Sequence, residues 1–108
     1  MSDISITSIH TIALLEARKA SHAAYAKIGD GYPCGFSWVK VFGVKLSTKA
    51  GKEFKALGFR KDYEGGISLW NPGGMSVQNV DVKEAGARAY AEVLKKYGYT
   101  AYAGSRLD

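Results

Sequence analysis

Residues 36–46 decide the fold, and they read Phe-Ser-Trp-Val-Lys-Val-Phe-Gly-Val-Lys-Leu. Aromatic and β-branched residues dominate this stretch and no helical repeat runs through it, so it predicts a long β-strand. Successive side chains of a strand point to opposite faces. One face therefore carries Trp38, Lys40, Phe42 and Val44, and the other carries Val39, Val41 and Gly43.

A short helix and a hairpin are predicted directly after this strand. Ser47 or Thr48 can cap a helix that runs to Leu57, and Gly58 can end it in the left-handed conformation. The hairpin then consists of a strand at 59–61, a turn rich in Gly and Asp at 62–65, and a strand at 66–70.

Two longer helices flank this unit. Apolar residues recur at three- and four-residue steps across residues 5–28, which predicts one amphipathic helix. After a loop at 71–79, Asp81 and Glu84 form a capping-box pattern at the start of a second helix that runs to about Tyr97.

The order of these elements indicates an α+β fold. With a last strand at 99–103, the long N-terminal helix is followed by a βαββαβ unit, the split βαβ arrangement of ferredoxin-like folds. This order predicts a single domain over 1–108 with a small, mainly antiparallel sheet and helices packed on it. Residues 36–104 would form its core and residues 105–108 a tail. Without the short strand at 59–61, the order becomes βαβαβ and the sheet partly parallel.

Length and composition place the chain among single globular domains. It has 108 residues, of which 46% are hydrophobic and 23% charged, enough to bury a core without disulfides. Cys34 is the single cysteine, which excludes an internal disulfide and a Cys-rich zinc site and indicates a reducing, cytoplasmic setting. We expect no export signal and no membrane-spanning segment.

Positive charge is concentrated in one segment. The chain has a net charge of +5, yet residues 36–61 hold seven Lys or Arg and one Glu. A basic block interleaved with aromatic residues is typical of surfaces that contact phosphates and stack on bases. The alternative is a solvated helix face with ordinary surface lysines.

The predicted sheet combines rings and positive charge on one face. Val39, Val41, Ile67 and Leu69 would face the helices, which leaves aromatic and basic side chains on the other side. The predicted nucleic-acid-binding residues are Trp38, Lys40, Phe42, Arg60, Trp70 and Tyr102, joined by Lys52 and Lys55 of the short helix. The rings would stack on bases and the cations would hold the backbone. Alternatively, the long N-terminal helix covers this face and its rings belong to the core.

No catalytic, metal or cofactor site is predicted. His10 and His22 are twelve residues apart on one helix, a spacing that does not make an adjacent metal-binding pair. Cys34 has no His close in sequence that would activate it. Residues 71–74 lack the Gly-Lys-Ser/Thr ending of a phosphate-binding loop.

Several segments resemble small proteins encoded by bacteriophages and mobile elements. Residues 52–60, followed by Ser68-Leu69-Trp70, are similar to a helix, Gly-Phe-Arg, turn and Trp unit of such proteins, and residues 81–86 and 101–106 are similar to further segments. The resemblance implies a bacteriophage-type origin and an accessory role in the host cytoplasm. That role includes counter-defence by binding a host protein or nucleic acid.

The leading hypothesis is a small non-enzymatic protein that binds single-stranded nucleic acid. The alternative is an interaction protein that docks on a host or phage protein, or on a second copy of itself, through a sheet edge or the first helix. A third hypothesis is a small-ligand binder with a pocket between the sheet and the loop 71–79. Its residues would be Tyr63, Trp70, Asn71 and Gln78.

Overall fold

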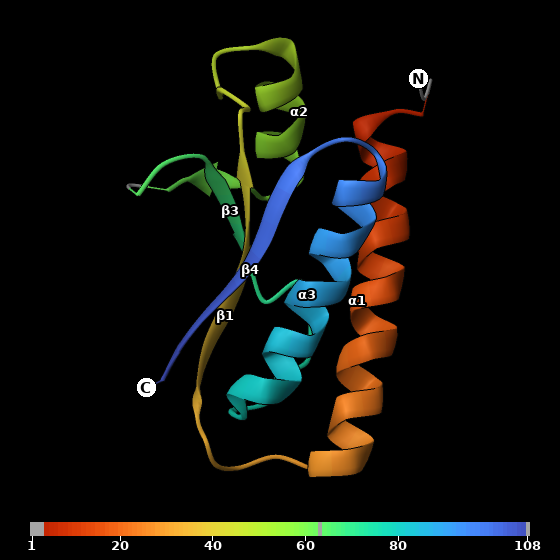
Figure 1. Ribbon diagram of the computed structural model, residues 1–108, viewed down its shortest axis with the longest axis vertical. Helices are drawn as coiled ribbons and strands as arrows, with labels where there is room; N and C mark the ends of the chain where they lie inside the picture. The colour runs from red at the N-terminus through yellow and green to blue at the C-terminus, as the bar shows by residue number, and fades with distance from the viewer. Residues whose placement is uncertain (1–3, 63, 108) are drawn as a thin grey trace.

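The computed structural model describes residues 4–62 and 64–107. Its helices are α1 (Ile6–Ile28), α2 (Lys49–Ala56) and α3 (Val80–Lys96), and its strands are β1 (Gly35–Phe42), β2 (Arg60–Lys61), β3 (Ile67–Trp70) and β4 (Thr100–Leu107) (Figure 1). The prediction of an α+β fold with a long N-terminal helix and a small antiparallel sheet is confirmed.

The sheet has the strand order β2-β3-β1-β4, and each neighbouring pair is antiparallel. On the inner strand β1, Trp38 is opposite Trp70 of β3 on one side and opposite Gly104 of β4 on the other. The short strand predicted at 59–61 is present as β2. The alternative βαβαβ order with a partly parallel sheet is therefore wrong.

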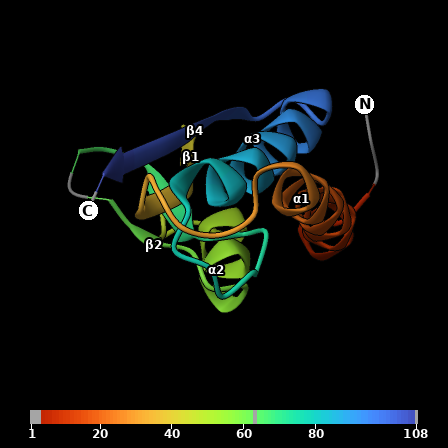
Figure 2. The ribbon, with the colours of Figure 1, turned by 90° about the horizontal axis from the view of Figure 1, so that it is seen from below.

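One face of the sheet is covered by α3, and α1 packs beside α3 (Figures 1 and 2). Val39 and Val41 of β1 and Ile67 of β3 are buried in the core, and Leu69 is partly buried against it. Phe54 of α2 belongs to the same core. The alternation predicted for β1 is confirmed, whereas on β3 both Ile67 and Ser68 are buried.

Small residues bring α1 and α3 into close contact. Ser21 of α1 donates a hydrogen bond to the Val82 carbonyl oxygen at 2.9 Å, and a Cβ atom at Gly86 of α3 would overlap the Ser21 hydroxyl. His10 of α1 shares a hydrogen bond of 2.6 Å with the hydroxyl of the buried Tyr90. Because α1 buries its small-residue side against α3, the alternative in which it covers the aromatic side of the sheet is wrong.

Two strand ends differ from the prediction. β1 ends at Phe42, because Gly43 has a φ of 82° and turns the chain out of the sheet. Val44 therefore does not extend the β1 face. β4 continues to Leu107, so the tail predicted at 105–108 is wrong as far as the described residues reach. All eight residues of β1 are paired in register with β4, and this antiparallel ladder stabilises the C-terminal segment as a strand.

The N-terminal cap of α3 also differs from the prediction. Asn79 is the capping residue, and its side-chain oxygen accepts a hydrogen bond from the Val82 N–H at 3.1 Å. The capping box predicted for Asp81 and Glu84 is therefore wrong. The Asp30 carboxylate accepts a hydrogen bond from the Asn79 N–H at 3.1 Å, which ties the cap to the loop after α1.

Candidate functional site

Aromatic side chains gather on the sheet face opposite α3. We call this set the aromatic face; it consists of Phe36, Trp38 and Phe42 from β1, Trp70 from β3 and Tyr102 from β4. Trp70 and Tyr102 leave 52% and 53% of their surface exposed. Soluble monomers bury most of their large aromatic side chains, so this exposure makes the aromatic face a candidate interaction surface.

Trp38 and Trp70 form the centre of the aromatic face. They are opposite each other in register, with ring centroids 5.1 Å apart and ring planes inclined by 38°. The Phe36 ring packs at a steep angle against Trp70, with centroids 5.9 Å apart. On the other side, a Cβ atom added to Gly104 would lie 2.5 Å from Trp38 Nε1. Gly104 thus makes room for the Trp38 ring, and these neighbours hold both indoles in place.

Three cations that the sequence analysis missed lie beside the rings. The Arg106 guanidinium is 5.4 Å and Lys83 Nζ 5.3 Å from the centroid of Phe36, and Lys95 Nζ is 5.6 Å from that of Tyr102. Lys83 Nζ also donates a hydrogen bond to the Gly35 carbonyl oxygen at 2.9 Å, and Lys95 Nζ pairs with Glu92 at 3.0 Å. These distances fall within the range of cation–π contacts. Arg106 falls in the predicted tail, and no local motif reveals that α3 brings Lys83 and Lys95 to these rings.

Lys40 lies on the predicted face but is bound to the β2–β3 turn. Its Nζ is 2.7 Å from Glu64 Oε1 and 3.7 Å from Asp62 Oδ1. The hydrogen bond to Glu64 is the main cause that raises the pKa of Lys40. Lys40 is therefore not a free cation, and the turn places two carboxylates beside the aromatic face.

The carboxylates, the tryptophan pair and Arg106 line one hollow of about 200 Å³. We call it the Trp hollow; its residues are Trp38, Asp62, Glu64, Trp70 and Arg106. Two residues after Trp38 on β1 comes Lys40, which pairs with the carboxylates. Two residues before Trp38 comes Phe36, which is opposite Arg106 of β4. The indole rings therefore lie between a negative and a positive end. This arrangement suits a flat ligand with hydrogen-bond donors at one end and an anion at the other.

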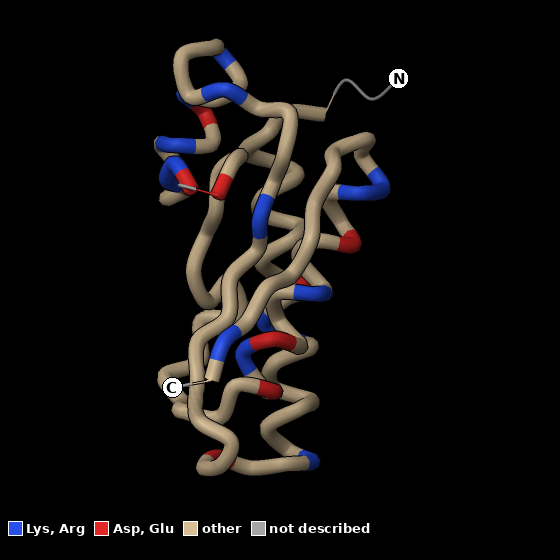
Figure 3. The backbone as a smooth tube through the Cα atoms, turned by 60° about the vertical axis from the view of Figure 1, so that its left-hand side comes forward, with Lys and Arg blue, Asp and Glu red and all other residues tan. Residues whose placement is uncertain are grey.

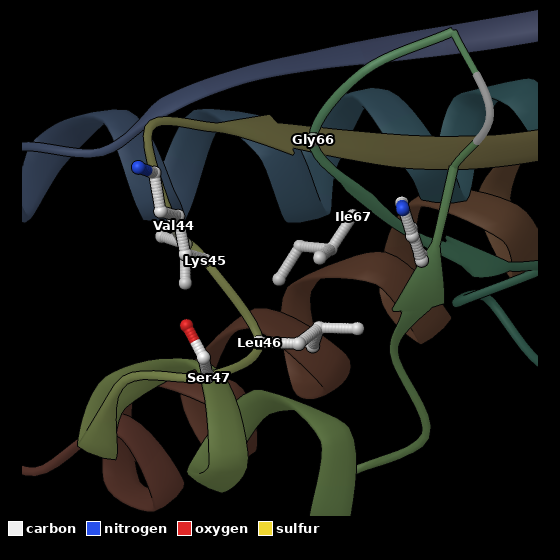
Figure 4. Close-up of a pocket in the computed structure, with 7 residues that line it drawn as sticks. Val44, Lys45, Leu46, Ser47, Gly66 and Ile67 are labelled. Carbon is white, nitrogen blue, oxygen red and sulfur yellow. The ribbon is translucent and has the colours of Figure 1, made fainter.

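The other predicted cations lie apart from the Trp hollow. Lys55 of α2 lines a second hollow with Arg60 and Lys61 of β2, and Lys45 and Lys61 line an adjoining third (Figure 4). We call these four residues the basic edge; none forms an ion pair with any other described residue. Lys52 is exposed on α2 and lines none of these three hollows. Basic positions gather around α2 and β2 (Figure 3), and by its register Arg60 shares the side of the aromatic face.

The residues predicted for a small-ligand pocket have other partners. The Asn71 amide donates a hydrogen bond to the Met75 carbonyl oxygen at 3.0 Å, and Gln78 Oε1 accepts one from the Cys34 thiol at 3.5 Å. Tyr63 lies outside the described residues. Within 4–62 and 64–107, no three His, Cys, Asp or Glu side chains cluster in a way that could hold a metal ion. None of the described helices is long and apolar enough to cross a membrane.

Comparisons with protein families, curated proteins and solved structures found no match for this chain. The aromatic face, the Trp hollow and the basic edge are the features of the molecule that point to a function.

Proposed function

We propose that the protein is a small non-enzymatic binding protein that contacts single-stranded nucleic acid through the aromatic face. The observation that carries this proposal is the half-exposed ring of Trp70, held against Trp38 on an uncovered sheet face. Every base has a π-face, and each stack on an aromatic side chain contributes about 1–3 kcal/mol. Tyr102 on β4 offers a second exposed ring across β1.

Cations flank these rings in positions that suit a sugar–phosphate backbone. Arg106 lies against Phe36 toward the β4 edge of the sheet, whereas Lys83 and Lys95 beside Phe36 and Tyr102 are already held by the Gly35 carbonyl oxygen and by Glu92. The basic edge lies at the opposite, β2 side. A strand that crosses the sheet from β4 to β2 would meet positive charge at both ends and aromatic rings between them.

We assign ferredoxin-like topology to the βαββαβ unit as part of this proposal. The strand order β2-β3-β1-β4 with antiparallel neighbours supports the assignment. Four-stranded sheets of RNA-recognition domains stack bases on their aromatic side chains. The open face here offers rings of the same kind. α2 departs from the usual arrangement, because it has eight residues and packs against α1.

A bacteriophage-type origin and an accessory role in the host cytoplasm, including counter-defence, belong to the same proposal. The resemblance of residues 52–60 and 68–70 supports them. To test this role, the wild type and Trp70→Ala are each expressed in a bacterium that is then infected with phage. Phage growth is compared between the two. We expect an effect of the wild type that the variant lacks.

Fluorescence anisotropy with labelled single-stranded DNA and RNA across a salt titration tests the binding function. We expect the logarithm of the binding constant to fall linearly with the logarithm of the salt concentration, and tryptophan emission to be quenched. Trp70→Ala should weaken binding by about tenfold or more at every salt concentration, because it removes one stack. Arg106→Ala should instead reduce the salt slope by about 1.

Tyr25→Ala is the matched control for Trp70→Ala. It also truncates an exposed aromatic ring, but on α1, which packs on α3. We expect it to leave strand binding unchanged. Circular dichroism and thermal melting establish that each variant is folded. Normal binding by a folded Trp70→Ala protein would contradict the proposed function.

Association of two copies through α1 is a second candidate function. Leu15 is 60% and Ile28 50% exposed on this helix, and Ile12 is exposed as well. Exposed apolar side chains on one helix favour a docking surface, and a symmetric dimer would cover them. Light scattering after size exclusion should then give twice the chain mass of 11.7 kDa. Leu15→Asp should restore the monomer, and a monomeric wild type would contradict this candidate.

A further inference from the structure

We propose that the Trp hollow recognises a guanine base of the bound single strand. This inference rests on the proposed function and deepens it, because stacking alone accepts any base. The hollow adds two carboxylates and one guanidinium to the stacking rings. Hydrogen bonds to these groups distinguish the bases by their edges.

The rings provide a rigid floor for one base. Trp70 is half exposed, and its orientation is held by Trp38 at 5.1 Å and by Phe36 at 5.9 Å between centroids. Trp38 is held in turn by its close approach to Gly104. A base stacked on the exposed side of Trp70 therefore lies in a plane that the protein determines, and its edge meets the walls of the hollow.

Asp62 and Glu64 supply hydrogen-bond acceptors at one wall. Lys40 holds both carboxylates there, at 3.7 Å from Asp62 Oδ1 and 2.7 Å from Glu64 Oε1. Asp62 Oδ1 also accepts a hydrogen bond from the Glu64 N–H at 2.9 Å, which ties the Asp62 carboxylate to the Glu64 backbone. Among the described residues, these contacts engage one oxygen of each carboxylate. The second oxygens can accept hydrogen bonds from a ligand.

Guanine fits these acceptors better than the other bases. Its Watson–Crick edge presents two adjacent donors, N1–H and the N2 amino group, which carboxylate oxygens can accept together. Adenine and cytosine present one amino donor beside an acceptor nitrogen. Uracil and thymine present one N–H between two carbonyl oxygens, which a carboxylate repels. The carboxylate acceptors of Asp62 and Glu64 therefore favour guanine.

Arg106 supplies the opposite end of the hollow. Its guanidinium packs over Phe36 at 5.4 Å, and the register places it on the far side of the tryptophan pair from Lys40 and the carboxylates. A stacked guanidinium keeps its planar N–H donors for a phosphate oxygen. The hollow thus presents acceptors, rings and a cation in the order that suits the base edge, base face and phosphate of one nucleotide.

Short oligothymidine strands that differ only at the central base test this inference by anisotropy. We expect a central guanine to bind about tenfold or more tightly than a central thymine, the range of a good two-point base contact. Inosine lacks the N2 amino group and should bind between the two. Because this series uses the unaltered protein, it does not depend on the folding of any variant.

Two variants test the carboxylates directly. Glu64→Gln and Asp62→Asn should abolish the preference for guanine, while the affinity for the all-thymine strand stays equal or rises because a negative charge is lost near phosphates. Glu16→Gln is the matched control, since Glu16 pairs with Lys19 on α1 at 3.4 Å and the same charge is removed away from the hollow. It should keep the preference.

The outcomes separate this inference from the proposed function. Salt-dependent binding with equal affinity for guanine, inosine and thymine would overturn the inference and leave the function standing. Failure to bind any strand would overturn both. Binding of an arginine-rich peptide in place of the strands, weakened by Glu64→Gln, would make the hollow a site for a cationic side chain of a protein. If guanosine monophosphate bound as tightly as the strand, the hollow would recognise a free nucleotide, and the proposal that it recognises a base within a strand would be overturned.

Discussion

Substitution of Gly104 by alanine should disturb the tryptophan pair without altering either tryptophan. The added Cβ atom would lie 2.5 Å from Trp38 Nε1 and 2.7 Å from Cε2, so the indole must swing away from β4. Overpacking of this kind costs about 1–3 kcal/mol, and loss of the ring pair adds about 0.5–1.5 kcal/mol. We therefore expect the free energy of unfolding to fall by about 1.5–4.5 kcal/mol and Tm to fall by on the order of 10 °C.

Thermal and urea unfolding measure this loss of stability, and near-ultraviolet circular dichroism reports on the tryptophan pair. Strand binding should weaken too, because Trp38 no longer supports Trp70. Leu107→Ala is the control on the same strand, since Leu107 is 67% exposed and its truncation should change stability by no more than about 0.5 kcal/mol. An unchanged Tm and an unchanged near-ultraviolet spectrum for Gly104→Ala would refute the pairing of this part of β4 with β1.

Two further predictions concern α3 and its contact with α1. Asn79→Ala should lower the free energy of unfolding by about 1 kcal/mol, because it removes the cap of the Val82 N–H. Asp81→Ala should lower the free energy of unfolding by less than Asn79→Ala does. If urea unfolding gave the same decrease for both variants, the assignment of Asn79 as the cap would be contradicted. The free energy of unfolding should also decrease as the pH is lowered, because burial lowers the pKa of His10 from its ordinary 6.5. The unfolded chain takes up this proton first, so the stability is complete above about pH 6.5 and is lost as pH falls toward the lowered folded pKa. Urea unfolding on both sides of pH 6.5 should show that His10→Gln reduces this dependence; an identical dependence in the variant would exclude His10 as its source.

The positions of the helices follow largely from local signals. The helix predicted over 5–28 is α1 at Ile6–Ile28, and Thr48 caps α2 by accepting a hydrogen bond from the Gly51 N–H at 3.1 Å. Gly58 follows α2 with a φ of 108°. Apolar repeats, caps and glycine ends act between residues within about one helical turn. They can therefore be recognised without knowledge of the tertiary structure.

The start of α3 shows where local signals were insufficient. Asn79 and Asp81 are both good capping residues, and the capping-box pattern favours the second. Contacts distant in sequence favour the first, because the Asn79 N–H donates to Asp30 at 3.1 Å and its side-chain amide donates to the Tyr32 carbonyl oxygen at 3.0 Å. These contacts hold Asn79 in an extended conformation, and the helix begins at Val80.

The sequence by itself determined which rings share a face. Trp38 and Phe42 are four residues apart on one strand, and an even spacing places both side chains on the same face. This alternation is a local geometric rule. The sequence also contained the aromatic and basic composition of the candidate site. The preference for buried Val39 and Val41 on the opposite face follows from the same rule and is confirmed.

Only the tertiary structure decided that this face is open and which charges meet its rings. α1 could have buried its apolar side on the sheet, but its small residues allow a closer approach to α3, and the aromatic face is left uncovered. Lys40 is paired with Glu64, 24 residues away in sequence, and Arg106 joins the site because β4 continues along β1. Electrostatic partners are set by distance in space, which the strand register and the packing of the helices determine.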